Sequence, residues 1–367
     1  MRHTQTAFFY FFSVLLSMNI FANIEMLKLD PGFKISIFAS DLDQPRQMIE
    51  SKNGTIFIGE RSGQIIALID SDGNGQADSK RVIADDLTYS TGVSIFEGDL
   101  YFSEIGKIWK IQDIENWLQK NSSGFPEKIL VTQDLPEDKW HGWKWLQHNV
   151  DGDIYTNVGA PCNNCISENP QYASIIRLSD DNWEYVARGV RNSVGFDFHP
   201  ETSKLYFGDN GRDWLGDDSP SCELNRVDED GLFYGFPYQH ALNVKDPEYG
   251  DLKSGYDYVD PILELGAHVA PTGLAFYDGE MFPKKYKNNI FITLHGSWNR
   301  SKKVGYKVIR VVLDSSGDVV DTKDFISGWL DGEKVLGRPA APLIVSDGSL
   351  LISDDKANVI YRITYKQ

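Results

Sequence analysis

The chain has 367 residues, among them 32 glycines, 20 phenylalanines, 17 tyrosines and 9 tryptophans. This composition favours short strands and tight turns over long helices. The formal net charge of −17 at pH 7 would repel a phosphate backbone, which argues against nucleic acid as a partner.

The N-terminus is typical of an export signal. A basic residue, Arg2, precedes an apolar run over residues 7–20, and the small residue Ala22 follows. A retained membrane anchor is the alternative, but polar residues interrupt the run, which is shorter than the roughly 20 residues of a spanning helix. We predict a signal peptide over residues 1–22, one domain over residues 23–367 without a further transmembrane segment, and a periplasmic or secreted location.

One pattern recurs six times: a Gly or Asp turn, an alternating apolar strand, a break and a second strand. The six instances join residues 53–58 to 64–68, 98–102 to 107–111, 151–155 to 174–178, 203–207 to 223–227, 289–293 to 306–310, and 347–352 to 358–363. Strands of period two in a repeated sheet bury both faces only by stacking between two other sheets. We therefore predict an all-β, six-bladed β-propeller, because a β-sandwich does not repeat a hairpin with this regularity.

An acidic segment, Asp70–Asp78, follows the first predicted strand pair. Its carboxylates at alternate positions and a glycine at the sixth position fit the first half of an EF-hand loop. The twelfth position is Arg81 rather than the glutamate that such a loop requires. A calcium site and a polar hairpin turn both remain open, and we leave the segment out of the predicted sites.

The chain has three cysteines, so one is left over if two pair in an oxidising compartment. Cys162 and Cys165 are close enough in Pro-Cys-Asn-Asn-Cys to close a small local ring, and we predict a disulfide there. No second Cys-x-x-Cys or histidine pair supplies further zinc ligands. Cys222 is then the free thiol.

Propellers bind ligands at the axis, where loops at the ends of the innermost strands converge. Four unusual polar segments lie next to predicted strands: Trp140–Trp143, Arg188–Gly195, Gly208–Asp213 and Cys222–Asn225. The sequence has no Gly-x-Ser-x-Gly, His-Glu-x-x-His or phosphate-loop motif, and no helix-opening Gly-x-Gly-x-x-Gly. Hydrolases and nicotinamide-dependent enzymes are therefore disfavoured.

Taken together, four segments resemble the quinoprotein glucose/sorbosone dehydrogenases, most closely the sorbosone dehydrogenase-like branch. The segments are Gly189–Asn192, Asp209–Asn225, Leu294–Arg300 and Gly337–Pro339. The resemblance covers nearly all of the mature chain and implies a six-bladed propeller with pyrroloquinoline quinone (PQQ) and a calcium ion at its axis. It further implies oxidation of a sugar hydroxyl or aldehyde, with electrons passed to an external acceptor such as a quinone or a cytochrome.

By position, the resemblance makes His141 the general base, which accepts the proton of the substrate hydroxyl while hydride leaves for the quinone. From spacing alone, His141 is also consistent with an imidazole packed between Trp140 and Trp143. His268 and His295 flank the same mouth and are candidates without an assigned role.

The resemblance also implies a set of binding residues. The positions that contact the cofactor are Arg191, Asn192, Arg338 and, with a looser match, Arg300. An arginine fork can hold a carboxylate of the quinone with two hydrogen bonds. The backbone carbonyls of Gly211 and Arg212 correspond to calcium ligands. The sequence departs from the family at Cys222, where an acid commonly precedes Glu223.

We therefore predict a PQQ-dependent enzyme that oxidises an aldose or a related aldehyde or polyol with the help of calcium. The alternative is a non-enzymatic secreted propeller that binds a glycan or a protein at its axial mouth. His141, the Arg191–Asn192 pair and the Asp209–Arg212 loop occur together, and a binding module has no need to keep all three. Their joint presence favours the enzyme.

Overall fold

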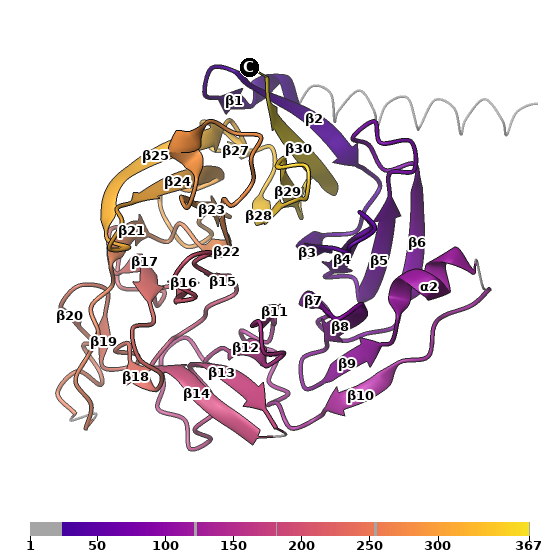
Figure 1. Ribbon diagram of the computed structural model, residues 1–367. Helices are drawn as coiled ribbons and strands as arrows, with labels where there is room; N and C mark the ends of the chain where they lie inside the picture. Colours follow the sequence, from indigo (N-terminus) through magenta and orange to yellow (C-terminus); the bar gives the residue numbers. More distant parts are fainter. Residues whose placement is uncertain (1–23, 121–122, 181, 253–254, 367) are drawn as a thin grey trace, which may run out of the picture.

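In the computed structural model, which describes residues 24–120, 123–180, 182–252 and 255–366, six β-sheets surround a central axis (Figure 1). This arrangement confirms the prediction of an all-β, six-bladed propeller. The predicted signal peptide lies outside the described residues. Across the described ranges, no helix is both long and apolar enough to cross a bilayer.

The first three blades follow one another in the sequence, each an antiparallel sheet whose first strand lies nearest the axis. Blade 1 contains β3 (Pro45–Glu50), β4 (Ile56–Glu60), β5 (Gln64–Ile69) and β6 (Ser79–Ala84). Blade 2 contains β7 (Val93–Phe96), β8 (Asp99–Ser103), β9 (Ile108–Ile111) and β10 (Ile129–Thr132). Blade 3 contains β11 (Leu146–His148), β12 (Ile154–Val158), β13 (Ser174–Ser179) and β14 (Asn182–Arg188), and it gains the parallel strand β18 (Leu232–Phe233).

The last three blades include the two N-terminal strands of the described chain. Blade 4 contains β15 (Phe196–Phe198), β16 (Leu205–Asp209), β17 (Ser221–Arg226) and β21 (Leu263–Ala267). Blade 5 contains β22 (Pro271–Phe276), β23 (Ile290–Leu294), β24 (Lys307–Leu313), β25 (Val319–Ser327) and β1 (Lys28–Leu29). Blade 6 contains β28 (Pro339–Ile344), β29 (Leu350–Asp354), β30 (Val359–Tyr365) and β2 (Phe33–Ala39).

Each of the six predicted strand pairs forms the second and third strands of one blade. The second strands β4, β12, β16, β23 and β29 are buried at every position. They are covered on both faces by the neighbouring blades and flanked by a strand on each side, so they have the strongest apolar pattern. The short innermost strands do not show the repeated pattern, and the sequence did not identify them.

Helix is a minor part of the described chain, as the composition indicates. The helix α2 (Ile114–Gln119) connects β9 to β10 and buries Ile114 and Leu118, four residues apart on one face. A single 3₁₀ turn, η1 (Lys284–Tyr286), precedes β23. Two small ribbons lie outside the blades: β19 (Gln239–His240) with β20 (Val244–Lys245) in the insertion of blade 4, and β26 (Leu330–Asp331) with β27 (Lys334–Val335) in the connection from blade 5 to blade 6.

The ring is closed by the N-terminal strands. Strand β2 pairs antiparallel with β30, from Phe33 opposite Tyr365 to Ala39 opposite Ile360. Strand β1 pairs with β25 at the outer edge of blade 5. The segment from β1 to β2 therefore bridges blades 5 and 6, and it joins the start of the propeller to its end.

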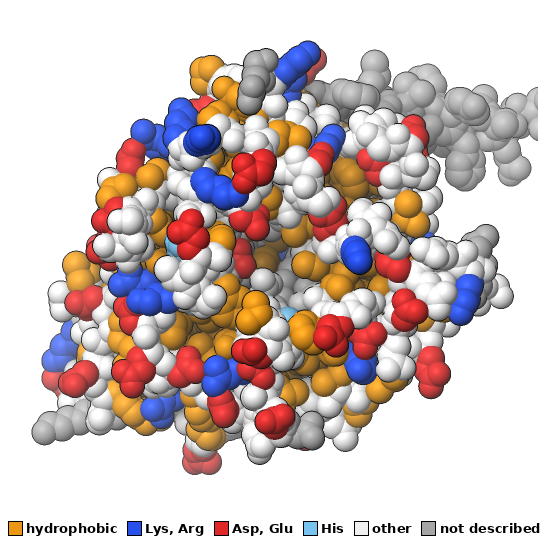
Figure 2. Space-filling view, viewed as in Figure 1, with side chains coloured by type: hydrophobic (Ala, Val, Ile, Leu, Met, Phe, Trp, Pro, Cys, Tyr) orange, Lys and Arg blue, Asp and Glu red, His pale blue; other side chains and the backbone are white. Residues whose placement is uncertain are grey.

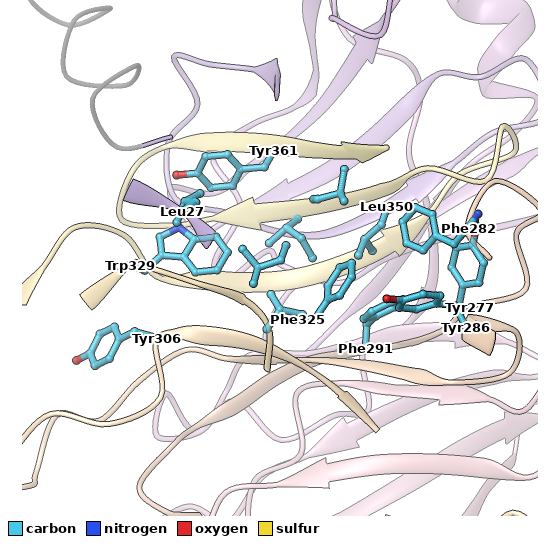
Figure 3. Close-up of a cluster of buried hydrophobic side chains, with 14 of the residues drawn as sticks. Leu27, Tyr277, Phe282, Tyr286, Phe291, Tyr306, Phe325, Trp329, Leu350 and Tyr361 are labelled. Carbon is cyan, nitrogen blue, oxygen red and sulfur yellow. Dashed lines mark hydrogen bonds between the residues drawn. The ribbon is translucent and has the colours of Figure 1, made fainter. Parts of the chain in front are cut away.

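An aromatic cluster fills the seam between these two blades (Figure 3). Phe291 and Phe325 of blade 5 lie with ring centroids 4.5 Å apart, and Tyr277 stacks on Phe282 at 4.4 Å. Tyr361 of blade 6 belongs to the same cluster. The cluster holds the closing blade against its neighbour through buried apolar surface.

Replacing Phe291 by alanine is expected to lower the free energy of unfolding by about 3–5 kcal/mol, because the fully buried ring leaves a cavity at the seam. The measurement is urea denaturation followed by tryptophan fluorescence. The matched control is Phe125→Ala, since that ring is 53 % exposed. Equal losses for the two variants would show that the seam does not depend on this packing.

Candidate functional site

The innermost strands run along the axis, so their two ends surround two mouths, and the centre of the disc is hollowed (Figure 2). A cavity of about 370 Å³ lies at the starts of these strands and is lined by residues such as Arg46, Asn192 and Arg338. A larger cavity of about 490 Å³ lies at their ends, next to Ile49 and Ile344. We call the first the basic cavity and the second the acidic cavity.

The acidic cavity is lined by three carboxylates and, among its described lining residues, by no lysine or arginine. Burial raises the pKa of one of these carboxyls, Asp197, to about 7. Its two oxygens accept hydrogen bonds from the Gln147 side chain and from the backbone N–H groups of Phe198 and Phe276. Asp197 therefore ties blades 3, 4 and 5 together, which is a structural role.

The basic cavity has the opposite charge. Four arginines line it, Arg46, Arg61, Arg191 and Arg338, with Asp213 as the only carboxylate among the described lining residues. This concentration of guanidinium groups occurs in a chain whose formal net charge is −17. Such a wall attracts a ligand that carries several carboxylates.

A buried charge cluster holds two of these arginines at one side of the cavity. Asp355, which follows β29, lies 2.8 Å from an Arg46 nitrogen and 3.5 Å from an Arg61 nitrogen. Burial opposes ionisation of Asp355, but Arg46 and His295 outweigh it and hold the pKa of this carboxyl well below its usual range. The Nε–H groups of both arginines are buried without a hydrogen-bond partner among the described residues. They are donors available to a bound acceptor.

His295 completes this cluster and lines the basic cavity. Its Nε2 donates to Asp355 over 2.7 Å, because a carboxylate can only accept. Burial lowers the pKa of His295 to about 4, despite the carboxylate beside it. The imidazole is therefore neutral, with the lone pair on Nδ1.

Arg338 lies on the same side and is held by backbone carbonyls. Its Nε donates to the carbonyl of His295 over 3.1 Å and its Nη2 to that of Gly296 over 2.6 Å. The guanidinium lies over the Tyr306 ring, 5.4 Å from the centroid. These contacts fix the plane of the group and leave its remaining N–H donors for a ligand.

Arg191 lies across the cavity, and protein acceptors occupy most of its donors. The guanidinium donates to the carbonyls of Asn163 and Asn210, to the side-chain oxygen of Asn163 and to the carboxylate of Asp213. Arg191 is therefore mainly a hub that orders the surrounding loops. Its neighbour Asn192 also lines the cavity, and the Oδ1 of Asn192 is buried without a described partner.

His141 lies in the wall with an unusual backbone conformation, φ 52°. It packs against the end of β12, where a Cβ on Gly159 would lie 2.5 Å from the His141 Cβ. His141 Nδ1 donates to the carbonyl of Ala160 over 2.8 Å, so Nε2 carries no proton in the neutral ring. Burial, with Arg191 adding to it, lowers the pKa of His141 to about 3. The side chain is thus a neutral acceptor at physiological pH.

The loop predicted to supply calcium ligands lies beneath Arg191. Gly211 lines the cavity, whereas the guanidinium of Arg212 pairs with the buried carboxylate of Asp246 and Arg212 is not a lining residue. Asp209, at the start of this loop, accepts the backbone N–H groups of Arg191 and Asn192. Burial raises the pKa of Asp209 and of Glu223, which faces it across the β16–β17 pairing.

Cys222 lines the cavity next to this loop. Burial raises the pKa of its thiol, so the residue does not bring the negative charge that an acid would provide at the same position. An acid at this position would bring a charged oxygen to the wall, and the Cys222 thiol does not. Any calcium here would depend more on carbonyl oxygens than it does where an acid stands at this position.

Arg300 is not brought to the cavity. Its guanidinium donates to the carbonyl of Asp217 and pairs with the carboxylate of Asp218 at 2.7 Å. Of the predicted site residues, the structure therefore brings together in the basic cavity His141, Arg191, Asn192, Gly211 and Arg338. His268, the other unassigned candidate, also lines it, with Nε2 donating to the carbonyl of Gly216 over 2.7 Å.

Three residues of the site were missed by sequence reasoning: Arg46, Arg61 and Asp355. Arg46 lies at the start of β3, Arg61 follows β4 and Asp355 follows β29, and no motif of the resemblance covers them. Only their position in the sequence could have identified two of them as candidates. Asp355 directly follows the repeated strand β29, and Arg61 directly follows the repeated strand β4. Their convergence becomes visible only once the ring is closed.

Exposed aromatic side chains mark the rim of the basic cavity. Trp140 is 51 % exposed, Trp298 64 % and Trp214 68 %. The rings of Trp214 and Trp298 meet edge to face at 5.3 Å, and Trp140 and Trp298 line the cavity itself. Large exposed apolar faces next to a polar cavity are typical of a ligand-binding rim.

The acidic segment Asp70–Asp78 forms the exposed turn between β5 and β6. It brings the carboxylates of Asp70, Asp72 and Asp78 within 4.8 Å of one another. These oxygens already accept hydrogen bonds from backbone N–H groups of the turn, including those of Ser71 and Gly75. A polar hairpin turn accounts for the geometry.

The chain is similar to proteins of known sequence. It is 35 % identical over 354 residues to an uncharacterized protein of Borreliella burgdorferi, covering 93 % of this chain and 91 % of that one. A family described as TrAA12-like matches residues 235–331.

Solved structures share the fold of the chain. Iodide and calcium structures of the Trichoderma reesei Carbohydrate-Active Enzymes Family AA12 protein superpose with TM-scores of 0.78 and 0.77, at 17 % identity. The matches cover 93 % of this chain and 98 % and 97 % of those chains. The holo form of the pyranose dehydrogenase PQQ domain from Coprinopsis cinerea superposes with a TM-score of 0.76 at 17 % identity, covering 92 % of this chain and 97 % of that one. These likenesses confirm the resemblance at the level of the fold, and the sorbosone branch stays a prediction.

The ring nitrogen signals of His141 are expected to remain those of a neutral imidazole protonated at Nδ1 from pH 8 down to roughly pH 5. The reason is that its folded pKa is lowered to about 3, so protons bind at this ring only below that range. The measurement is a pH titration by NMR of histidine-labelled protein, with His141→Ala to assign the signal. A midpoint near the ordinary value of about 6.5 would contradict the buried, neutral state.

Proposed function

This chain belongs to the same family as the uncharacterized Borreliella burgdorferi protein, and we propose that it is an oxidoreductase with bound PQQ and calcium. Its proposed substrate is an aldose or a related aldehyde or polyol. The observation that supports this most is the basic cavity, in which four arginines surround a neutral histidine in an otherwise acidic protein. A fold shared with a PQQ domain of a pyranose dehydrogenase agrees with it.

The residues of the basic cavity fit a quinone with several carboxylates. Arg46 and Arg61 each have a buried Nε–H without a described partner, and Arg338, whose Nε and Nη2 donate to backbone carbonyls, lines the same cavity. Asn192 adds an amide from the opposite wall. We propose that these four side chains hold the cofactor by charge-assisted hydrogen bonds, with Arg191 ordering the wall behind Asn192. When bound, the quinone supplies an acceptor for hydride.

The proposed calcium position is next to Gly211, whose backbone lies in the cavity wall. When bound, the ion supplies a positive charge that polarises quinone oxygens. The Arg212 side chain contributes by pairing with Asp246, which anchors the loop from the far side. The calcium structure of the Trichoderma reesei relative supports this part of the proposal.

The proton chemistry is assigned to His141. The hydrogen bond from its Nδ1 to the Ala160 carbonyl selects one tautomer, in which Nε2 carries the basic lone pair. The Nε2 lone pair accepts the proton of the substrate hydroxyl as the C–H hydrogen departs as hydride. His295 is the second imidazole of the cavity, and its bond to Asp355 leaves Nδ1 as its acceptor.

The rim aromatics give the site its preference for a flat, partly apolar substrate. Trp140 lies against His141, with ring centroids 5.7 Å apart, and Trp298 stands across the mouth among the lining residues. A sugar ring has apolar C–H faces and polar edges, which suits a site with indole rings above and arginines below. We propose that these tryptophans orient the substrate toward His141.

We further propose that the protein acts outside the cytoplasm, in a periplasm or after secretion, on the basis of the signal peptide that the sequence predicts over residues 1–22. The disulfide between Cys162 and Cys165 is consistent with an oxidising compartment. The electrons are proposed to pass to an external quinone or cytochrome.

Calorimetric titration of the purified protein with PQQ, with and without calcium, is expected to show tight, calcium-dependent binding. Arg338→Met is expected to weaken it about 10- to 100-fold, since a hydrogen bond to a charged group contributes about 1.5–3 kcal/mol. The matched control is Arg300→Met, because the Arg300 guanidinium pairs outside the cavity.

Equal effects of these two substitutions would contradict the assignment of the cavity. The absence of PQQ binding by the unaltered protein at micromolar quinone would overturn the proposed function. That result would favour the alternative of a non-enzymatic propeller that binds a glycan or a protein at its mouth.

Replacing His141 by asparagine is expected to lower kcat for aldose oxidation about 100- to 10,000-fold, the usual contribution of a general base. PQQ affinity should stay close to that of the unaltered protein, because His141 is not among the proposed cofactor ligands. The comparison is His295→Asn, measured in the same dye-reduction assay and the same quinone titration. A larger loss of kcat in His295→Asn would move the base to the imidazole bound to Asp355.

A further inference from the structure

The disulfide between Cys162 and Cys165, predicted from the sequence, is present in the structure. It closes a small ring in the insertion between β12 and β13 and encloses two residues, Asn163 and Asn164. The two enclosed asparagines do not point away into solvent. Asn163 contacts residues of the basic cavity directly, and Asn164 contacts Asp246, which pairs with the loop beneath the cavity.

Asn163 holds the guanidinium of Arg191 with two acceptors. The Nε of Arg191 donates to the Asn163 carbonyl over 2.9 Å, and an Nη donates to the Asn163 side-chain oxygen, also over 2.9 Å. Two acceptors from one residue on two nitrogens of one guanidinium fix the plane of that group. The orientation of Arg191 is therefore set largely by the backbone and side chain of Asn163.

Asn163 holds the loop beneath the cavity as well. Its side-chain oxygen accepts the backbone N–H of Asp213 over 2.8 Å, and its side-chain nitrogen donates to the Asp213 carbonyl over 3.1 Å. The amide of Asn163 thus pairs with both backbone groups of Asp213. One side chain from blade 3 connects Arg191 to the loop that contains Gly211.

Asn164 extends this contact on the outer side of the loop. Its side-chain nitrogen donates to Asp246 over 3.0 Å. The same carboxylate pairs with Arg212 and accepts a hydrogen bond from His240. The two asparagines therefore hold the loop over residues 210–213 at two points. Asn163 binds Asp213 directly, and Asn164 binds Asp246, which pairs with Arg212.

The ring is what keeps these asparagines in place. The connection between β12 and β13 is long, and it lacks regular secondary structure between Val158 and Ser174. A free chain of this kind loses conformational entropy when it is ordered, and a covalent ring of four residues removes much of that freedom in advance. The disulfide thereby prepares Asn163 for its four hydrogen bonds.

We propose that Asn163 is a positioning residue for the proposed cofactor site and that the Cys162–Cys165 ring holds it in its working conformation. It acts through Arg191 and through the loop over residues 210–213, and it does not touch the cofactor. The inference rests on the proposed function for its effect on PQQ, but its effect on the order of the cavity wall is independent of that function.

The test opens the ring in two ways. Dithiothreitol reduces the disulfide: it gives two electrons and two protons to the sulfurs of Cys162 and Cys165, which become thiols, and is itself oxidised to a cyclic disulfide. Both cysteines are partly exposed, whereas Cys222 is buried and already a thiol. The double variant Cys162→Ser/Cys165→Ser opens the ring without a reductant.

The positioning role is tested with Asn163→Ala, and the matched control is Asn169→Ala, an exposed asparagine of the same insertion outside the ring. Hydrogen–deuterium exchange is expected to rise locally over residues 189–192 and 210–213 in Asn163→Ala and in the opened ring, and not in the control. PQQ affinity is expected to fall about 10- to 100-fold in the same samples, the usual effect of removing a group that supports the residues of a binding site, because Arg191 and the loop over residues 210–213 order the wall that carries Asn192 and Gly211. Adding Asn163→Ala to the double serine variant is expected to cause little further loss, because both changes break one connection.

The outcomes separate the two proposals. If the unaltered protein binds no PQQ, the proposed function fails, and the exchange data alone decide whether Asn163 orders the wall. If exchange over residues 189–192 and 210–213 and PQQ affinity both match the control, the positioning role is overturned. It is also overturned if exchange rises evenly over all blades, since that pattern reports a loss of global stability alone.

Discussion

Every blade of this propeller has two apolar faces, and no blade can cover both by itself. The second strands of the blades are buried at nearly all positions because a neighbouring sheet packs on each side. In an open row of such sheets, the first and the last sheet would each expose one apolar face. The pairing of the N-terminal strand β2 with β30 closes the row into a ring, so that no such face stays exposed. The stability of each blade therefore depends on closure of the ring, which brings residue 33 beside residue 365.

Closure also creates the site. The innermost strands start at the end of the axis where the second strands finish, so residues at the starts of the first and at the ends of the second converge although they are far apart in the sequence. Arg46 and Asp355 meet at 2.8 Å across the seam between the first and last blades. The resulting wall of guanidinium groups acts on the histidines within it, since burial and nearby positive charge both keep His141 and His295 neutral. One set of arginines can thus serve to attract anions and to keep an imidazole available as a base.

Sequence reasoning succeeded where the physical signal is local. Two short apolar runs within residues 56–60 and 64–69, separated by a turn, identify a hairpin without knowledge of the rest of the chain, and each of the six predicted hairpins is present. The Cys162–Cys165 disulfide was predicted for the same reason, because three residues of separation suffice to define it. The grouping of His141, Arg191, Asn192, Gly211 and Arg338 around one cavity followed from family motifs rather than from any local pattern.

The remaining features depend on long-range geometry. The cluster of Arg46, Arg61 and Asp355 has no local pattern, since its members lie at opposite ends of the chain. Arg300 is the last residue of the Leu294–Arg300 segment, part of which lines the cavity. Its guanidinium instead forms an ion pair with the carboxylate of Asp218 and lies outside the cavity. The direction of one side chain at the rim depends on the conformation of two inserted loops, and residue types alone do not specify it.

The two cavities at opposite ends of the axis differ in charge, with arginines around one and the carboxylates of Asp151, Asp197 and Asp278 around the other. The channel therefore presents guanidinium groups at one end and acidic side chains at the other. In a solution of low ionic strength, an approaching anion is repelled by most of the acidic surface and drawn to a single entrance, where low-dielectric walls focus the field. In a chain with a formal net charge of −17, the basic cavity thus presents a polyanion with one favourable place to dock. Added salt weakens that guidance over distances beyond a Debye length.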